Sequence, residues 1–256
     1  MMRVIKIGLL SLLFIFVLAL IAVAFAPARL LLIATDRWAP QVEMSEPTGT
    51  LWQGEAKQVA VTINGIKLEL GTLSWHLSAL SLLTIEPSIE LVVKAPEHQA
   101  QMRVSANTDQ EITVDNMEGT FPLSLLEPWV PLLIEGDLAF VVDHIIFNQR
   151  QLLAVDGVLN LQEADWVGGD IRMPLGSYIA QVSLAENRDV LVQLNDFSAT
   201  LGIDGLITIS PAGHYHFNCV LQKRDGLAPE VAQSVSWFGK KNAQGDILVD
   251  QKGRWN

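Results

Sequence analysis

The chain has 256 residues, of which 50% are hydrophobic and 18% are charged. This composition excludes an intrinsically disordered chain, because apolar side chains are plentiful enough to form a core. Acidic residues outnumber Lys and Arg by 28 to 17, and the net charge of −11 argues against nucleic-acid binding, which depends on clustered cations. The single cysteine, Cys219, excludes an intramolecular disulfide.

The first feature in chain order is a long apolar segment. Residues 7–26 carry no charged side chain over 20 positions. A helix of that length spans about 30 Å, the thickness of the hydrocarbon core of a bilayer. A cleaved signal peptide is the alternative, because A-x-A motifs end at Ala24 and Ala26. The length of the apolar run, and Pro27 directly after the second motif, favour an uncleaved transmembrane helix over residues 7–26.

The charges on either side of this segment predict its orientation. Arg3 and Lys6 precede it, whereas all 28 acidic residues and 15 of the 17 basic residues follow it, which leaves a net charge of −13 beyond the segment. We therefore expect a single-pass protein of the bacterial inner membrane, which contacts the lipid bilayer through its N-terminal helix. The predicted divisions are a cytoplasmic N-terminus, the transmembrane helix, a membrane-proximal segment and a periplasmic β-rich domain, at residues 1–6, 7–26, 27–48 and 49–256.

Alternation of apolar and polar residues dominates the rest of the chain and is typical of β-strands. Residues 59–63 and 66–70 alternate on either side of Asn64-Gly65, a strong signal for a hairpin turn. Further predicted strands are 71–75, 134–142, 158–161, 178–184, 190–194, 205–209 and 214–221. Helical patterns are limited to 123–134 and 229–238. These patterns predict a mainly β domain made of a twisted, mostly antiparallel sheet with few short helices.

A short glycine pattern recurs along the predicted strands. Gly-x-apolar-x-apolar begins at Gly71, Gly119, Gly136, Gly157 and Gly205. Because glycine tolerates positive φ and bulges, we expect these glycines at strand starts. Their irregular spacing argues against a solenoid.

Two tryptophan motifs carry a resemblance to a known family. Gly49-Thr50-Leu51-Trp52-Gln53-Gly54-Glu55-Ala56 resembles the G-T-L-W-x-G-x-A element of the type II secretion system protein N family. The stretch from Trp75 to Leu83 is similar to that family's second motif, and Pro27-Ala28-Arg29-Leu30 resembles its entry region after the anchor. From the residues themselves, we expect core packing for Trp52 and Trp75, with contact to a partner protein as the alternative.

The resemblance implies an inner-membrane component of the machine that moves folded proteins across the outer membrane. It implies an accessory role in assembly, and contacts with other inner-membrane subunits of that machine. The family contributes no catalytic residues. The motif positions with a structural or partner-contacting role are Gly49, Leu51, Trp52, Gly54, Ala56 and Trp75.

Motifs for enzymatic chemistry are missing from the sequence, which contains no G-x-S-x-G, no P-loop and no H-E-x-x-H. His214 and His216 would share one face of a strand while Cys219 points to the other, so they do not predict a metal site. Asp165 and Asp170 flank a Gly-Gly turn and are expected to be solvated, with Arg172 as an ion-pair partner of either one. We predict a non-enzymatic protein without catalytic residues, cofactor or metal.

A second function is kept open by the excess of apolar residues. A long sheet with one apolar face, anchored at the inner membrane, can form a groove that binds or conducts lipid in the periplasm. This alternative depends on whether the apolar face is covered by the protein's own helices or left open. A periplasmic hydrolase is a third and weaker interpretation, because the sequence shows no nucleophile–base pair.

Overall fold

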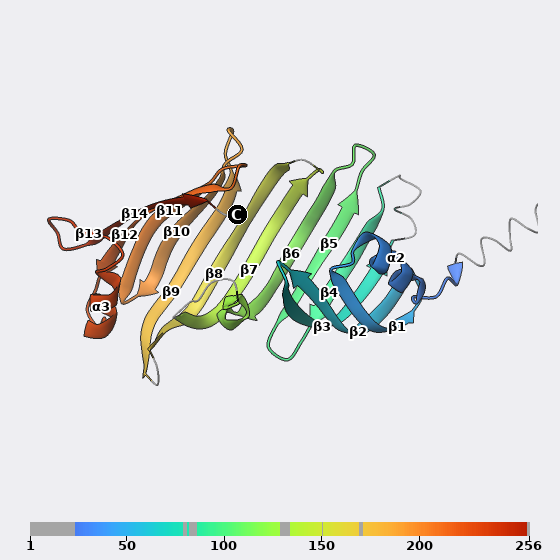
Figure 1. The fold of residues 1–256 in the computed structure, drawn as a ribbon, viewed down its shortest axis with the longest axis horizontal. Coiled ribbons are helices and arrows are strands. Elements are labelled where there is room, and N and C mark those ends of the chain that lie inside the picture. Colours follow the sequence, from blue (N-terminus) through green and yellow to red (C-terminus); the bar gives the residue numbers. More distant parts are fainter. Residues whose placement is uncertain are drawn as a thin grey trace, which may run out of the picture.

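The structure is a computed structural model that describes residues 24–78, 81, 86–128, 134–149, 151–168 and 171–254. Its main feature is one open antiparallel sheet of 14 strands (Figure 1). Neighbouring strands follow the chain order, except that the last two exchange places: β14 pairs with β12, and β13 forms the far edge outside β14. The strands are β1 (Val42–Gly49), β2 (Gln53–Ile63), β3 (Ile66–Leu77), β4 (Ser88–Lys94), β5 (Gln99–Ala106), β6 (Ile112–Pro122), β7 (Ile134–Phe147), β8 (Leu152–Gly168), β9 (Ile171–Leu184), β10 (Val190–Ala199), β11 (Leu201–Ile209), β12 (His214–Lys223), β13 (Lys240–Lys241) and β14 (Ile247–Arg254).

Three short helices accompany the sheet in the described ranges. They are α2 (Leu30–Trp38), the 3₁₀ helix η1 (Leu123–Leu126) and α3 (Pro229–Val235). In Figure 1, α2 lies at the β1 end of the sheet and α3 at the opposite end. The prediction of a mainly β, antiparallel fold with few short helices is confirmed.

The predicted hairpin at Asn64-Gly65 is also confirmed. Both residues have positive φ, at 51° and 81°, and they join β2 to β3. The prediction of a helix over 123–134 does not hold in the described part of that range, where only the four residues of η1 are helical and Ile134 already begins β7. Pro128 accounts for part of this result, since proline disfavours helical backbone at the residue before it.

The predicted transmembrane helix lies outside the described residues, apart from Ala24–Ala26. Among the helices that the structure does describe, none combines the length and the apolar character needed to cross a bilayer. The divisions at 1–6, 7–26, 27–48 and 49–256 therefore stay predictions.

The recurring glycines were expected at strand starts, but all five lie inside strands. Gly71 and Gly136 do have positive φ and lie at register shifts, as expected of bulges. Gly119 and Gly205 lie inside β6 and β11, and both are paired on each side with neighbouring strands. A Cβ at Gly119 would lie 2.7 Å from the ring of Phe140, and a Cβ at Gly205 would lie 2.3 Å from Cβ of Cys219. These glycines provide room for larger side chains on the next strand, which is a packing role rather than a turn.

One face of the sheet is apolar across nearly its whole width. Directly paired residues of antiparallel strands share a face, and one such series of pairs, here called the central row, crosses from β2 to β14 without a polar side chain. The central row is Ala56, Leu73, Val93, Ala100, Gly119, Phe140, Leu159, Ala180, Leu194, Gly205, Cys219 and Val249.

The opposite face is largely polar. One register position away from the central row, the paired residues on this opposite face are Ser74, Val92, Gln101, Glu118, Val141, Val158, Gln181, Gln193, Leu206, Asn218 and Asp250. Ion pairs bridge neighbouring strands on this face, as between Arg103 Nη2 and Glu90 Oε1 at 2.8 Å. Strand alternation therefore places water-soluble side chains on one side and hydrocarbon on the other.

Candidate functional site

The first candidate site is the glycine and tryptophan motif at the β1 end of the sheet. Trp75 on β3 is 4% exposed and packs in a core cluster with Ala28, Ala56 and Val59. Its indole Nε1 donates a hydrogen bond to the carbonyl oxygen of Thr50 at 3.2 Å. The burial of a large ring with its one polar atom satisfied makes Trp75 the centre of this cluster.

The two motif glycines make room for this arrangement. Gly54 is paired with Trp75 across β2 and β3, and a Cβ there would lie 2.4 Å from Cζ2 of the indole. Gly49 has φ +90°, and a Cβ there would lie 2.5 Å from the carbonyl oxygen of Gln53. Both positions exclude a larger side chain, because Gly54 faces the ring and Gly49 combines positive φ with backbone contact.

The same motif binds the chain that follows the predicted anchor. The amide of Leu51 donates to the carbonyl oxygen of Ala26 at 2.9 Å, and the amide of Ala28 donates to that of Gly49 at 3.1 Å. Pro27 and Thr50 form an isolated antiparallel bridge. The backbone at residues 26–28 is therefore fixed to the turn between β1 and β2.

The remaining motif residues lie around this turn. Leu51 and Trp52 are half-buried, and Ala56 is fully buried in the central row. The carbonyl oxygen of Trp52 accepts a hydrogen bond from the amide of Leu77 at 2.6 Å. The fold thus brings all six motif positions of the sequence analysis to one end of the sheet, while the partner contact suggested for them stays a prediction.

The second candidate site is the apolar face between the two ends of the sheet. In the described part of the chain, two core clusters cover the ends of this face: Ala28 and Leu31 pack on one end, and Val231 and Val235 of α3 pack on the other. Between them, the large central-row residues Leu159 and Leu194 remain partly exposed. A sheet normally buries its apolar face against a second layer, and an exposed apolar surface of this kind is typical of binding sites.

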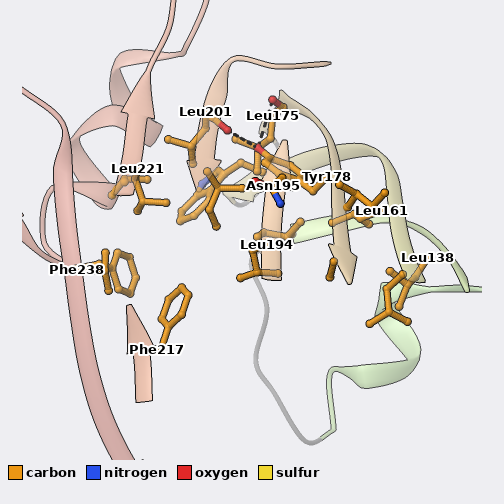
Figure 2. Close-up of a pocket in the computed structure, with 18 of the residues that line it drawn as sticks. Leu138, Leu161, Leu175, Tyr178, Leu194, Asn195, Leu201, Phe217, Leu221 and Phe238 are labelled. Atoms are coloured by element: carbon orange, nitrogen blue, oxygen red, sulfur yellow. Dashed lines mark hydrogen bonds between the residues drawn. The ribbon is translucent and has the colours of Figure 1, made fainter. Parts of the chain in front are cut away.

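The exposed region deepens into an open cavity of about 430 Å³ next to α3 (Figure 2). Its walls come from seven strands, β7 to β12 and β14, and from the segment at the end of α3. Figure 2 shows Phe217, Leu221 and Phe238 on one side, Leu138 and Leu161 on the other, and Leu194 between them. Its volume lies within the range of about 300–1,000 Å³ that is usual for ligand sites.

Polar groups are sparse in this cavity. None of its lining residues in the described part of the chain carries a charge, and its uncharged polar members include Tyr178, Asn195 and Gln251. The hydroxyl of Tyr178 donates to the carbonyl oxygen of Leu201 at 2.9 Å, so it is already satisfied within the protein. Burial raises the pKa of Tyr178 to about 12, so its phenol is neutral at physiological pH.

Cys219 and the neighbouring histidines do not form a metal site. Cys219 is 1% exposed on the apolar face, and burial raises the pKa of its thiol to about 11. His216 lies on the opposite face, where its Nε2 is 2.7 Å from Asp250 Oδ1. Strand alternation separates the two side chains, and the described residues contain no group of three metal-binding side chains close enough to hold an ion.

The predicted acidic turn around Asp165 and Asp170 lies partly within the residues that the structure describes. Asp165 Oδ2 lies 3.9 Å from Arg172 Nη1, and the same guanidinium also forms an ion pair with Glu135. The Asp165 and Arg172 side chains are 31% and 65% exposed, so this is a solvated surface pair. Asp170 lies outside the described residues.

Sequence reasoning did not identify the cavity. Its residues are spread from Ile134 to Gln251, and only the sheet register brings them together. The available signal was the apolar half of each alternating strand. It predicted an apolar face, but it did not predict that this face contains a cavity or where on the sheet the cavity lies.

Comparison with known proteins gives a consistent result. The family model described as type II secretion system (T2SS), protein N matches residues 40–249. The chain is 27% identical over 244 residues to type II secretion system protein N of Klebsiella pneumoniae, covering 90% of this chain and 89% of the relative. It is 23% identical over 238 residues to the protein of that name from Pectobacterium carotovorum subsp. carotovorum, covering 90% of each chain.

The protein of the same name from Vibrio cholerae serotype O1 is 24% identical over 222 residues, covering 83% of this chain and 85% of the relative. No solved structure matches the chain significantly. The family match covers most of the sheet, from just before β1 into β14, and includes both motif tryptophans. The chain therefore belongs to the type II secretion system protein N family and is a component of the type II secretion machinery.

Proposed function

We propose that this chain is a non-enzymatic inner-membrane subunit that supports assembly of the type II secretion machine, which exports folded proteins across the outer membrane. Residues 7–26 anchor it as a single transmembrane helix, residues 1–6 lie in the cytoplasm, and the domain of residues 49–256 lies in the periplasm. Residues 27–48 are the membrane-proximal segment between the anchor and this domain.

The observation that carries this proposal is the direct attachment of the sheet to the chain that follows the apolar segment. The hydrogen bonds from Leu51 to Ala26 and from Ala28 to Gly49 leave no linker between residue 26 and the sheet. If residues 7–26 span the bilayer, the β1 end of the sheet is held at the membrane surface. A subunit that organises other membrane proteins needs such a fixed position, because a free linker lowers the effective concentration of its binding surfaces.

The two edges of the sheet differ in a way that supports partner binding at one of them. At the first edge, β1 carries register shifts, a positive φ at Glu46 and the following Pro47, all of which discourage pairing with another strand. At the other edge, β13 pairs only with Ile247 and Leu248 of β14. Within the described part of the chain, residues 249–254 have a strand partner on one side only. We propose that a strand of another secretion subunit pairs there.

Photo-crosslinking in living cells tests this edge. A photoreactive amino acid at Lys252 on β14 is compared with the same group at Lys57, which lies on β2 between two paired strands. We expect the Lys252 position to yield adducts with another inner-membrane secretion subunit and the Lys57 position to yield none. Equal adducts at both positions, or none at Lys252 in cells that export normally, would refute strand pairing at this edge.

A reporter fusion tests the topology independently. Alkaline phosphatase fused after Asn256 becomes active only when the fused enzyme reaches the periplasm. We expect an active fusion, and membrane fractionation should recover the chain with the inner membrane. An inactive fusion, combined with an active cytoplasmic reporter at the same position, would overturn the proposed orientation.

A further inference from the structure

We propose that the open cavity next to α3 binds an acyl chain of a membrane phospholipid. This inference goes beyond the assembly role, and it rests on the proposed function in one respect, the anchoring of the β1 end at the membrane. It begins from the lining of the cavity, which is formed by leucine, isoleucine and aromatic side chains, among them Leu138, Leu194 and Phe217. A soluble polar ligand would lose its hydrogen bonds to water in such a site and regain few of them.

The position of the cavity within the sheet argues for a lipid chain rather than another small apolar molecule. The central row crosses the cavity at Leu159, Ala180 and Leu194, and continues strand by strand to Ala56 on β2. No polar or charged side chain interrupts it. At a spacing of about 4.8 Å per strand, the 14 strands give a width of about 60 Å.

The far end of this apolar row adjoins the proposed anchor. Ala56 packs in the same cluster as Ala28. Ala28 follows residue 26 by two positions, and its amide donates a hydrogen bond to the carbonyl oxygen of Gly49 at the end of β1. One end of the row therefore lies at the place where residues 7–26 would leave the bilayer, and the cavity lies toward the other end. An uninterrupted row of apolar side chains between a membrane and a cavity favours binding of hydrocarbon along it, because an acyl chain gains about 0.8 kcal/mol for each buried methylene group.

The charge of the protein fits the same occupant. Gln181, Asn218 and Asp250 lie on the opposite face, and the described lining of the cavity contains no cation that would bind a phosphate group inside it. A phospholipid would therefore place its hydrocarbon against Leu194 and Phe217 while its head group stays in water. Filling of the cavity by an acyl chain would also bury the partly exposed Leu159 and Leu194.

The test uses the full chain in living cells that carry the secretion system. A photoreactive benzoylphenylalanine replaces Leu194 in one strain and Phe217 in another, both inside the cavity. The matched control replaces Leu191, which lies on the same strand as Leu194 but is paired with Ser183 and Thr208 on the polar face. After irradiation, the purified chain is analysed for phospholipid adducts by radioactive phosphate labelling and by mass spectrometry of the adduct peptide.

We expect phospholipid adducts at Leu194 and Phe217 and none at Leu191. With the photoreactive group kept at Phe217, Leu194→Glu should abolish the adduct by introducing a charge into the cavity, whereas Leu191→Glu should leave it unchanged. A second variant, Ala180→Phe, fills the cavity without adding a charge and should also reduce the adduct. Both variants must be recovered from the inner membrane at the level of the unchanged chain, which separates loss of occupancy of the cavity from a general loss of folding.

The contradicting results are equally specific. Adducts only with another protein or with a second copy of this chain would assign the cavity to a protein interface and overturn lipid binding. Absence of any phospholipid adduct in chain recovered with the inner membrane would overturn it as well. Recovery of the chain away from the membrane would instead contradict the proposed anchoring, so the two failures are distinguishable.

Discussion

Truncation of Trp75 provides a quantitative test of how the sheet is stabilised. The side chain is 4% exposed, and removal of a buried aromatic ring to alanine costs about 3–5 kcal/mol. The hydrogen bond from its Nε1 to Thr50 at 3.2 Å is also lost, which adds about 1 kcal/mol. Trp75→Ala should therefore destabilise the β1 end by about 4–6 kcal/mol, which corresponds to a change of about a thousandfold or more in the local opening equilibrium.

Hydrogen exchange measured by mass spectrometry on the full chain in detergent is the appropriate assay, because it resolves local stability along the chain. In Trp75→Ala, protection should fall in peptides of β2 and β3 but persist in β12, β14 and α3. The reason is that the two core clusters, one around Trp75 and one around Val231 and Ile247, share no residue. Trp75→Phe should lose less protection, since it keeps most of the ring volume.

The control variant is Trp237→Ala, which removes a tryptophan that is 79% exposed. It should change exchange very little anywhere in the chain. Equal loss of protection at both ends of the sheet in Trp75→Ala would refute the separation into two cores. Unchanged protection in β2 and β3 would refute the central packing role of Trp75.

Four further results are expected. Gly119→Ala should lower the melting temperature, because its Cβ would lie 2.3 Å from a carbonyl oxygen of the neighbouring strand, and overpacking of this kind costs about 1–3 kcal/mol. Arg224→Ala should cost about 2 kcal/mol in chemical denaturation, because its guanidinium forms an ion pair with Asp196, whose side chain is 7% exposed. Cys219, with a thiol pKa raised to about 11, should react with iodoacetamide at pH 8 only after unfolding. Tyr178, whose pKa is raised from 10.0 to about 12, should make the fold less stable as the pH rises through that interval, because the unfolded chain loses the phenolic proton first.

Much of the fold could be predicted from local patterns. Strict alternation over 59–63 and 66–70, with Asn64-Gly65 between them, specifies a hairpin through side-chain period and turn geometry alone. Strand β5 (Gln99–Ala106) was not predicted although its apolar residues alternate strictly at positions 100, 102, 104 and 106, because two of these four are alanine and give a weak hydrophobic signal. The interpretation of 123–134 as a helix does not hold in its described residues, where η1 ends before Pro128 and Ile134 already belongs to β7, because proline disfavours helical backbone at the residue before it.

The candidate sites differ in how far the sequence could reveal them. The roles of Gly54 and Trp75 depend on their pairing across β2 and β3, so the motif marked the residues without showing that one makes room for the other. The cavity depends on register across seven strands and on the position of Phe238 after α3. No local pattern encodes such a long-range arrangement, although alternation did predict the apolar face from which the cavity is built.

Export of folded substrates in a bacterium whose secretion system includes this subunit tests the central claim most directly. The gene for the chain is deleted and then restored as the full chain or as Leu191→Glu, and secreted proteins are quantified in the medium. Deletion should retain those proteins in the periplasm, and the full chain and Leu191→Glu should restore export. Export that continues unchanged, with the remaining subunits still assembled in the deletion strain, would contradict a role for this chain in the secretion machine.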